Sequence, residues 1–351
     1  MLLTIVIFIA ILIVLILIHE FGHFVVAKLS GVKVKEFAFG FPPRITSVVK
    51  GGTRYSLNLI PLGGYVSLLG EDEAVKEPGS YYSAKIWQKI AIVGTGVVMN
   101  FILGILVIAI GFSIGMTPLV SDPAALSGTK TSQVMIVEVV PDSPAAKIGL
   151  ESGDVLNGFS SPSQLQQFTK SHAGEQVTLN IQSNNRRENF TTTLGQGDAP
   201  LGVGVVSITK VKQPFFRALG TAVIEVGKSI AAVIVALWGI IASIFTTGKA
   251  GEAGQAVVGP VGIFNFTSEA LRIGWIYILQ LLAILSINLG IINILPFPAL
   301  DGGKIFFLVL EGIFGKKIVR QEVENLIHTI GFIILIILIL AITFRDILRL
   351  R

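Results

Sequence analysis

Long apolar stretches alternate with more polar ones along the chain. A transmembrane helix needs about 20 largely apolar residues to cross roughly 30 Å of hydrocarbon. Four stretches meet this requirement, and we predict spans at 1–27, 86–116, 274–296 and 327–345. In the second of them Gly96, Asn100 and Gly104 recur every four residues, a spacing typical of close helix contacts.

A fifth apolar stretch, 229–245, is ambiguous. It follows Glu225 and Lys228 and has a borderline length for a span. Hydropathy allows either a transmembrane helix or an amphipathic helix in the membrane interface. The choice between them depends on where the candidate metal ligands must lie.

The region 118–213 has the alternating pattern of β-strands. It contains short alternating runs, such as 134–140 and 177–182, and a short helical pattern at 164–171. Turn residues separate these runs. The pattern predicts a small, independently folded α+β domain.

A second strand-like region lies within 28–85. Alternating runs at 33–39, 55–59 and 65–69 surround a Gly51-Gly52 turn. The region is too apolar and too rich in glycine for a solvated loop. We predict a β-hairpin that dips toward the membrane, where protein or a water-filled cavity satisfies its backbone groups.

Composition strengthens the membrane interpretation. Charged residues make up 14% of the chain and apolar residues 52%, with a mean hydropathy of +0.76. A typical soluble protein has about 25% charged residues, so a fully soluble or disordered chain is excluded. The absence of cysteine excludes disulfides, thiolate-bound zinc and thiol catalysis. The net charge of +5 is spread along the chain, which argues against nucleic-acid binding.

The candidate chemistry lies in His19-Glu20-Phe21-Gly22-His23, at the end of the first span. Histidines four residues apart on a helix share one face and can bind one Zn²⁺, which leaves Glu20 as a general base. Zinc lowers the pKa of a coordinated water from about 15.7 to near 7. The alternative is that both histidines are packing or snorkelling residues. It is the weaker one, because ionisable groups inside an apolar helix are costly and usually functional.

A catalytic zinc normally takes three protein ligands, so one ligand is missing from this motif. His172 lies in the predicted soluble domain and His328 begins the last span, which makes both poor candidates. Asp301 follows two helix-breaking prolines and precedes two glycines within 296–303. It could simply cap the next helix. Beside an HExxH motif in the membrane, the metal interpretation is favoured.

These motifs resemble the site-2 protease family of intramembrane zinc metalloproteases. The likeness is greatest to the bacterial branch that cleaves anti-sigma factors, the regulator-of-sigma-E type. Four further segments look like the family's re-entrant β-hairpin, second-span Gly–Asn motif, PDZ signature and a segment before its third span. They are 60–66, 94–100, 143–156 and 259–263, respectively. The chain departs from the family in having Thr95-Gly96 where Gly-Pro is usual, and in having room for one PDZ domain.

The resemblance implies roles for individual residues. It gives His19, His23 and Asp301 as zinc ligands and Glu20 as the base. It also implies that Asn293 and Asn288 contact the substrate backbone or polarise the scissile carbonyl. For the two asparagines the alternative is interhelical hydrogen bonding.

The expected fold is therefore a polytopic α-helical membrane protein. It has four transmembrane helices, a membrane re-entrant β-hairpin and one inserted PDZ-like α+β domain. His19, His23 and Asp301 must lie near one side of the bilayer, and a fifth span at 229–245 would separate them. We therefore predict that 214–273 is an interfacial or linker segment, with 229–245 interfacial or re-entrant, and that 297–326 is a loop.

Charge predicts the orientation. The first loop carries nine basic residues, at 28, 33, 35, 44, 50, 54, 76, 85 and 89. The positive-inside rule places this loop and the active site toward the cytoplasm, and the N-terminus and PDZ-like domain outside. Arg345, Arg349 and Arg351 then lie outside, against the rule. The expected location is the inner membrane of a bacterium.

The expected substrate is a single-span membrane protein, an anti-sigma factor or a signal-peptide remnant. Because a helix hides its carbonyl groups, the substrate must unwind, and the hairpin with Leu59 and Tyr65 could bind it by strand addition. The PDZ-like domain would admit substrates already trimmed by an upstream protease, or bind a peptide, lipid-anchored or periplasmic partner. A spacer or lid is the alternative role for this domain.

The competing function is non-enzymatic, a membrane metal transporter or a PDZ scaffold. Transporters usually carry polar groups across several helices, often with repeat symmetry. Here the polar residues gather at one depth, and Glu20 is not needed as a ligand. Hydrolysis is therefore favoured.

Overall fold

The computed structural model describes residues 1–71, 75–183, 186–247, 257–315 and 319–349. The chain forms two compact units. The first comprises Met1–Ile105, Ser229–Phe264 and Leu282–Arg351, and the second comprises Leu106–Lys228 and Asn265–Leu281.

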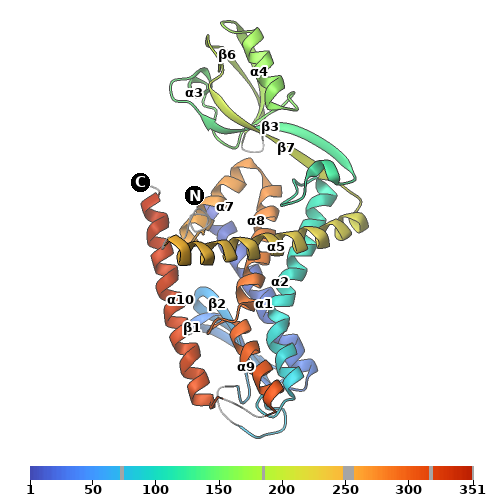
Figure 1. Cartoon of the computed structure of the whole chain (residues 1–351), viewed down its shortest axis with the longest axis vertical. Helices are drawn as coiled ribbons and strands as arrows, with labels where there is room; N and C mark the ends of the chain where they lie inside the picture. The colour runs from blue at the N-terminus through green and yellow to red at the C-terminus, as the bar shows by residue number, and fades with distance from the viewer. Residues whose placement is uncertain (72–74, 184–185, 248–256, 316–318, 350–351) are drawn as a thin grey trace. The chain divides into compact units, whose positions relative to one another are not determined.

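Within the described residues, five helices are long and apolar enough to cross a membrane. They are α1 (Leu2–Leu29), α2 (Ile86–Ile114), α5 (Phe215–Thr247), α8 (Trp275–Ile294) and α10 (Gln321–Arg349) (Figure 1). These are the helices of a multi-pass membrane protein. Four of them coincide with the predicted spans, and α5 contains the ambiguous stretch.

Small residues bring α2 and α8 into close contact in the first unit. A Cβ added at Gly104 would lie 3.0 Å from Ile287, and one added at Gly290 would lie 2.8 Å from the ring of Phe101. From the first of these contacts to the second, the residue number falls along α2 and rises along α8, so the two helices are antiparallel. Packing through small residues is typical of membrane helices, and Gly104 of the predicted small-residue stripe is part of this contact.

The predicted hairpin is a two-stranded antiparallel sheet of β1 (Val34–Lys50) and β2 (Thr53–Leu68). Gly51 and Gly52 form its turn with φ of 57° and 75°, values that favour glycine. The runs expected as separate strands at 55–59 and 65–69 belong to one strand, β2. Residues 36–39 of β1 pair with two stretches of β2, 54–57 and 64–67, so β2 runs along both sides of this part of β1.

The base of the hairpin is anchored to the helices by an apolar cluster. Val34 and Leu68 from the strands are buried with Ala27, Val32 and Ile92. Phe24 of α1 also packs edge-on against Phe37 of β1, with ring centroids 5.4 Å apart. This cluster holds the hairpin beside the end of α1 that carries the HExxH motif.

The second unit contains a five-stranded antiparallel sheet in the order β6-β5-β4-β3-β7. Its strands are β3 (Thr129–Val139), β4 (Val155–Leu156), β5 (Gln176–Ser183), β6 (Arg186–Thr193) and β7 (Val203–Lys212). In β5, Val177, Leu179 and Ile181 are buried and the residues between them are exposed, the period-two pattern seen in the sequence. Helices α3 (Pro144–Lys147) and α4 (Pro162–Ser171) and the turn η1 (Pro123–Ala125) lie between or beside these strands in the sequence.

Helix α5 is longer than the predicted apolar stretch, because it begins at Phe215 rather than near 229. Its acidic residue Glu225 is fully buried and accepts hydrogen bonds from three consecutive backbone N–H groups, those of Leu119, Val120 and Ser121, at 2.9–3.2 Å. A buried carboxylate is tolerated where hydrogen bonds satisfy it. The charge that made this stretch ambiguous thus serves a local contact within the second unit.

The expectation that 297–326 is a loop is wrong. Residues Asp301–Phe314 form helix α9, which ends at Gly315 with φ of 67°, and α10 begins at Gln321. The two glycines after Asp301 suggested irregular backbone, but they allow the first turn of α9 to pack closely on the preceding segment. A Cβ at Gly302 would lie within contact of the carbonyl oxygens of Ile294 and Leu295.

The predicted linker at 214–273 also contains α7 (Pro260–Ile273). The Asp346 carboxylate, near the end of α10, accepts hydrogen bonds from Gly259 N (2.8 Å) and Gly262 N (3.1 Å). These N–H groups lie at the start of α7, where an anion is favoured. Asp346 therefore fixes the beginning of α7 to the end of α10.

Candidate metal centre

Helix α1 presents His19 and His23 on one face. The two Nε2 atoms are 3.2 Å apart, and the rings meet edge to face with centroids separated by 4.8 Å. This is the geometry expected of histidines at positions i and i+4. Both side chains are largely buried, with exposed fractions of 10% and 13%.

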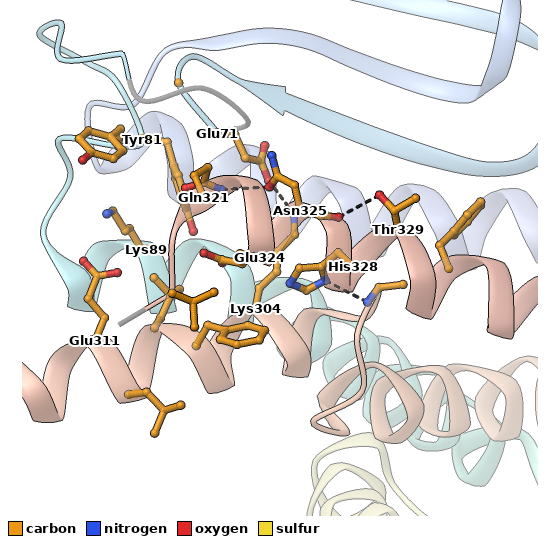
Figure 2. Close-up of a pocket in the computed structure, with 18 residues that line it drawn as sticks. Glu71, Tyr81, Lys89, Lys304, Glu311, Gln321, Glu324, Asn325, His328 and Thr329 are labelled. Carbon is orange, nitrogen blue, oxygen red and sulfur yellow. Dashed lines mark hydrogen bonds and ion pairs between the residues drawn. The ribbon is translucent and has the colours of Figure 1, made fainter. Parts of the chain in front are cut away.

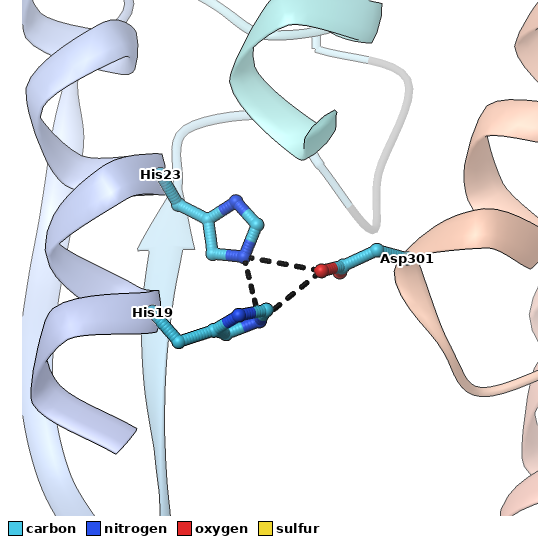
Figure 3. A group of neighbouring side chains, drawn as sticks. All are labelled: His19, His23 and Asp301. Atoms are coloured by element: carbon cyan, nitrogen blue, oxygen red, sulfur yellow. Dashed lines mark hydrogen bonds and ion pairs between the residues drawn. The ribbon is translucent and has the colours of Figure 1, made fainter. Parts of the chain in front are cut away.

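Asp301 completes the cluster from the first turn of α9. Its Oδ2 atom lies 3.1 Å from Nε2 of His19 and 3.5 Å from Nε2 of His23 (Figure 3). The possible ligand atoms of the three residues all lie within 4.8 Å of one another. The structure therefore brings together three residues that are 4 and 278 positions apart in the sequence.

Helix α2 orients both imidazole rings. Nδ1 of His23 lies 2.8 Å from the carbonyl oxygen of Ile92, so Nδ1 carries the proton and Nε2 keeps its lone pair. Nδ1 of His19 contacts the Asn100 amide at 3.1 Å. Sequence reasoning placed Asn100 in a helix contact and missed this role, although a buried amide inside an apolar span was a signal for it.

The absence of a side chain at Gly96 lets α2 approach the histidines. A Cβ at this position would overlap the His23 ring and lie 2.8 Å from Cε1 of His19. The family usually has a proline at this position. This chain has Gly96 there, and the glycine contacts the candidate ligands.

This donor set fits a zinc ion. Two imidazole nitrogens and one carboxylate oxygen are typical ligands of hydrolytic zinc. Two neutral Nε2 atoms at 3.2 Å repel each other unless a proton or a cation lies between them. Apart from its contacts with these two imidazoles, the buried Asp301 Oδ2 atom has no hydrogen-bond partner among the described residues. The possible ligand atoms of all three residues therefore converge on one point, as the ligands of a single ion would.

Two other predicted site residues lie near this cluster. The Asn293 amide, on the last turn of α8, is 3.3 Å from Nε2 of His19. Glu20 is half-buried, and a Cβ added at Gly64 of β2 would lie 3.1 Å from its Cγ. Strand β2 therefore passes directly beside the candidate base.

Among the described residues, no hydrogen bond or ion pair joins the remaining candidates to the histidines. Asn288 precedes Asn293 by five residues, so it points about 140° away around α8, and among the described residues none of the hydrogen bonds joins it to the cluster. Tyr65 pairs with Ala38 across the hairpin. Leu59, also on β2, is 59% exposed.

A cavity of about 730 Å³ lies between α9, α10 and the segment that follows β2 (Figure 2). Lys304, one turn after Asp301, forms an ion pair with Glu71 in its wall, with Nζ and Oε1 2.7 Å apart. The neighbouring Glu71 carboxylate raises the pKa of Lys304, so Lys304 is charged at neutral pH. His328 lines the same cavity.

Comparison with known proteins agrees with this chemistry. Residues 7–338 match peptidase family M50. A Clostridium acetobutylicum protein named as a zinc metalloprotease is 31% identical over 344 residues, which covers 95% of this chain and 94% of the relative. A Clostridium perfringens protein named in the same way is 32% identical over 340 residues, covering 95% of each chain. Zinc metalloprotease RasP of Oceanobacillus iheyensis is 29% identical over 440 aligned positions, covering 99% of each chain.

The match spans nearly the whole chain and confirms the resemblance inferred from the motifs. Site-2 proteases depend on zinc and act on membrane-bound substrates. The chain therefore belongs to peptidase family M50 and is an intramembrane zinc metalloprotease of the site-2 type.

Proposed function

We propose that His19, His23 and Asp301 hold the catalytic zinc and that Glu20 is the general base for hydrolysis of a peptide bond. The observation that carries this assignment is the convergence of the three ligand groups within 4.8 Å. When bound, zinc polarises the scissile carbonyl and acidifies a coordinated water. Glu20 then takes a proton from the attacking water and delivers it to the leaving amine.

The neighbouring amides position the ligands and the substrate in this proposal. For Nε2 of His19 to bind zinc, its Nδ1 must carry a proton. Rotating the Asn100 side-chain amide by 180° exchanges the positions of its nitrogen and oxygen. The oxygen, which has no other partner among the described residues, then accepts the proton of His19 Nδ1. Asn293 donates to the substrate carbonyl next to His19, whereas Asn288 binds the substrate farther along α8.

The direction of the helices supports four crossings. Because α2 and α8 are antiparallel, α8 starts on the membrane face where α2 ends. The intervening chain therefore crosses the membrane an even number of times. Helix α7 has only 14 residues, fewer than the roughly 20 that a span requires. We infer that α5 lies in the interface or re-enters from the same face, and that α1, α2, α8 and α10 are the spans.

The orientation follows from the basic first loop. It places the active site toward the cytoplasm and the N-terminus and the five-stranded unit outside, in the inner membrane of a bacterium. The order of strands and helices in that unit supports a PDZ-like domain. It would bind a peptide, a lipid-anchored protein or another periplasmic partner, and so admit substrates already cut by an upstream protease.

The substrate in this proposal is a single-span membrane protein, an anti-sigma factor or a signal-peptide remnant. Its helix must unwind before the scissile carbonyl reaches the zinc site. The re-entrant hairpin supports this step because β2 passes beside Glu20. The part of β2 that carries Leu59 and Tyr65 would bind the unwound segment as an added strand.

Glu20→Gln tests this proposal. Glutamine keeps the size of the side chain and removes the base, so zinc content should stay at the wild-type level. Cleavage of a purified single-span substrate in detergent should fall by about 10²–10⁴-fold. Undiminished cleavage by the zinc-loaded variant would refute the role of Glu20.

A further inference from the structure

The segment that carries Asp301 has an unusual backbone. Ala299, two residues before the carboxylate, has a φ of 79°, a conformation that residues other than glycine rarely adopt. A non-glycine residue held there is strained, so this conformation persists only where the surroundings enforce it. The position of Asp301 therefore depends on what holds this segment.

Two residues of α10 hold it. The Ala299 N–H donates a hydrogen bond of 2.9 Å to Nδ1 of His328. One turn later, Gly331 packs against the backbone of Pro298, where an added Cβ would lie 2.6 Å from the carbonyl oxygen. The His328 ring also meets Phe307 of α9 edge to face, with centroids 5.9 Å apart. All of these residues belong to the first unit.

We propose that His328 is a positioning residue for the metal centre, which holds the strained segment so that Asp301 reaches the two histidines. This inference rests on the proposed role of Asp301 as a zinc ligand. His328 is itself no ligand. Sequence reasoning considered it only as one, and set it aside because it begins the last span.

The hydrogen bond defines what a replacement must provide. Nδ1 accepts from Ala299, so the neutral ring carries its proton on Nε2, which has no hydrogen-bond partner among the described residues. Asparagine carries an amide atom near the place of Nδ1, whereas glutamine carries one near the place of Nε2. Leucine fills the volume and offers no acceptor.

The experiment compares His328→Asn, His328→Gln and His328→Leu in the full-length protein in detergent. Zinc retention is measured by competition with a chelator, and thermal unfolding of the zinc-free proteins is recorded beside it. Loss of a group that orients a ligand typically weakens metal binding about 10–100-fold. We expect that loss for the Gln and Leu variants and a loss of less than about 3-fold for Asn. Thr329→Val is the matched control, because the Thr329 hydroxyl, within the part of the chain that the structure describes, donates only to Asn325 O of its own helix.

Equal zinc retention in all three variants would overturn the inference, and so would equal loss. If the Leu variant does not fold, the comparison of Asn with Gln still decides, because both carry an amide. Asp301→Ala separates this inference from the proposed function. If that variant keeps zinc, the ligand assignment fails; if it loses zinc while every His328 variant keeps it, only the role of His328 fails.

Discussion

Gly96 shows how a single missing side chain shapes the metal centre. The spacing of small residues along the second span predicted a helix contact, but the sequence could not tell what lies opposite. In the structure the opposite surface is the pair of imidazole rings. The glycine thus sets the distance between α2 and the candidate ligands.

Gly96→Ala should therefore disrupt the site. The added methyl group overlaps the His23 ring, which the bond to Ile92 O holds in place. We expect a loss of zinc retention and of cleavage of about 10-fold or more. Gly94→Ala is the matched control, because among the described residues beyond its own helix turns its Cβ would meet only Ile305, at 3.8 Å. Equal zinc retention in both variants would show that α2 can move away without cost.

At the residue scale, contacts between residues close together in the sequence could be predicted, and contacts between distant residues could not. The geometry of an α-helix alone places His19 and His23 on one face, so their pairing could be predicted. Asn100 lies 81 positions from His19 and acts only through tertiary packing. His328 likewise acts on a backbone group 29 positions away. No local pattern reports contacts of this kind.

The hairpin is the element whose role can be tested most directly. Its strand β2 passes the candidate base, and its backbone is proposed to pair with an unwound substrate. Tyr65→Pro or Leu59→Pro removes one backbone N–H from that strand. We expect cleavage of a single-span substrate to fall much more than zinc content does.

Tyr65→Ala is the control for this prediction, because it removes the same side chain and keeps the N–H. A proline variant that loses zinc and cleavage equally would mean that the hairpin only supports the metal centre. Loss of cleavage in the alanine variant as severe as in Tyr65→Pro would assign the effect to the side chain.

Apolar periodicity predicted most elements, and it failed where close packing changes what a residue permits. Helix α9 was missed because glycine generally disfavours a helix. Here Gly302 and Gly303 let the first turn of α9 approach the preceding carbonyl groups closely. Helix α5 was expected to be shorter because Glu225 interrupts its apolar character. Three backbone hydrogen bonds satisfy that carboxylate, and the helix continues through it.

On the scale of the whole molecule, the hydropathy pattern predicted four of the five long apolar helices. The basic first loop predicts an orientation, and with that orientation the arginine residues at the C-terminus run against the charge rule. One of these arginine residues, Arg345, makes a local structural contact. The Arg345 guanidinium donates to the carbonyl oxygen of Val257, and the neighbouring Asp346 binds the start of α7. Arg345 thus serves a structural contact independent of orientation.

The topology can be tested by labelling single cysteines, since the chain has none of its own. Asp198→Cys probes the five-stranded unit, Thr247→Cys the end of α5, and Lys50→Cys the hairpin turn. An impermeant maleimide should label positions 198 and 247 in intact cells, and position 50 only after permeabilisation. Labelling of position 247 together with position 50 would mean that α5 crosses the membrane.

The central claim is that zinc is held by two histidines of α1 and the carboxylate of Asp301. X-ray absorption at the zinc edge, on the wild-type protein and on Asp301→Ala, measures this ligand set directly. We predict two imidazole nitrogens at about 2.0–2.1 Å with oxygen ligands at about 2.0–2.2 Å in the wild type. The variant should keep both imidazoles, lose the carboxylate and bind zinc more weakly. Identical spectra and equal zinc affinity for the two proteins would contradict the account.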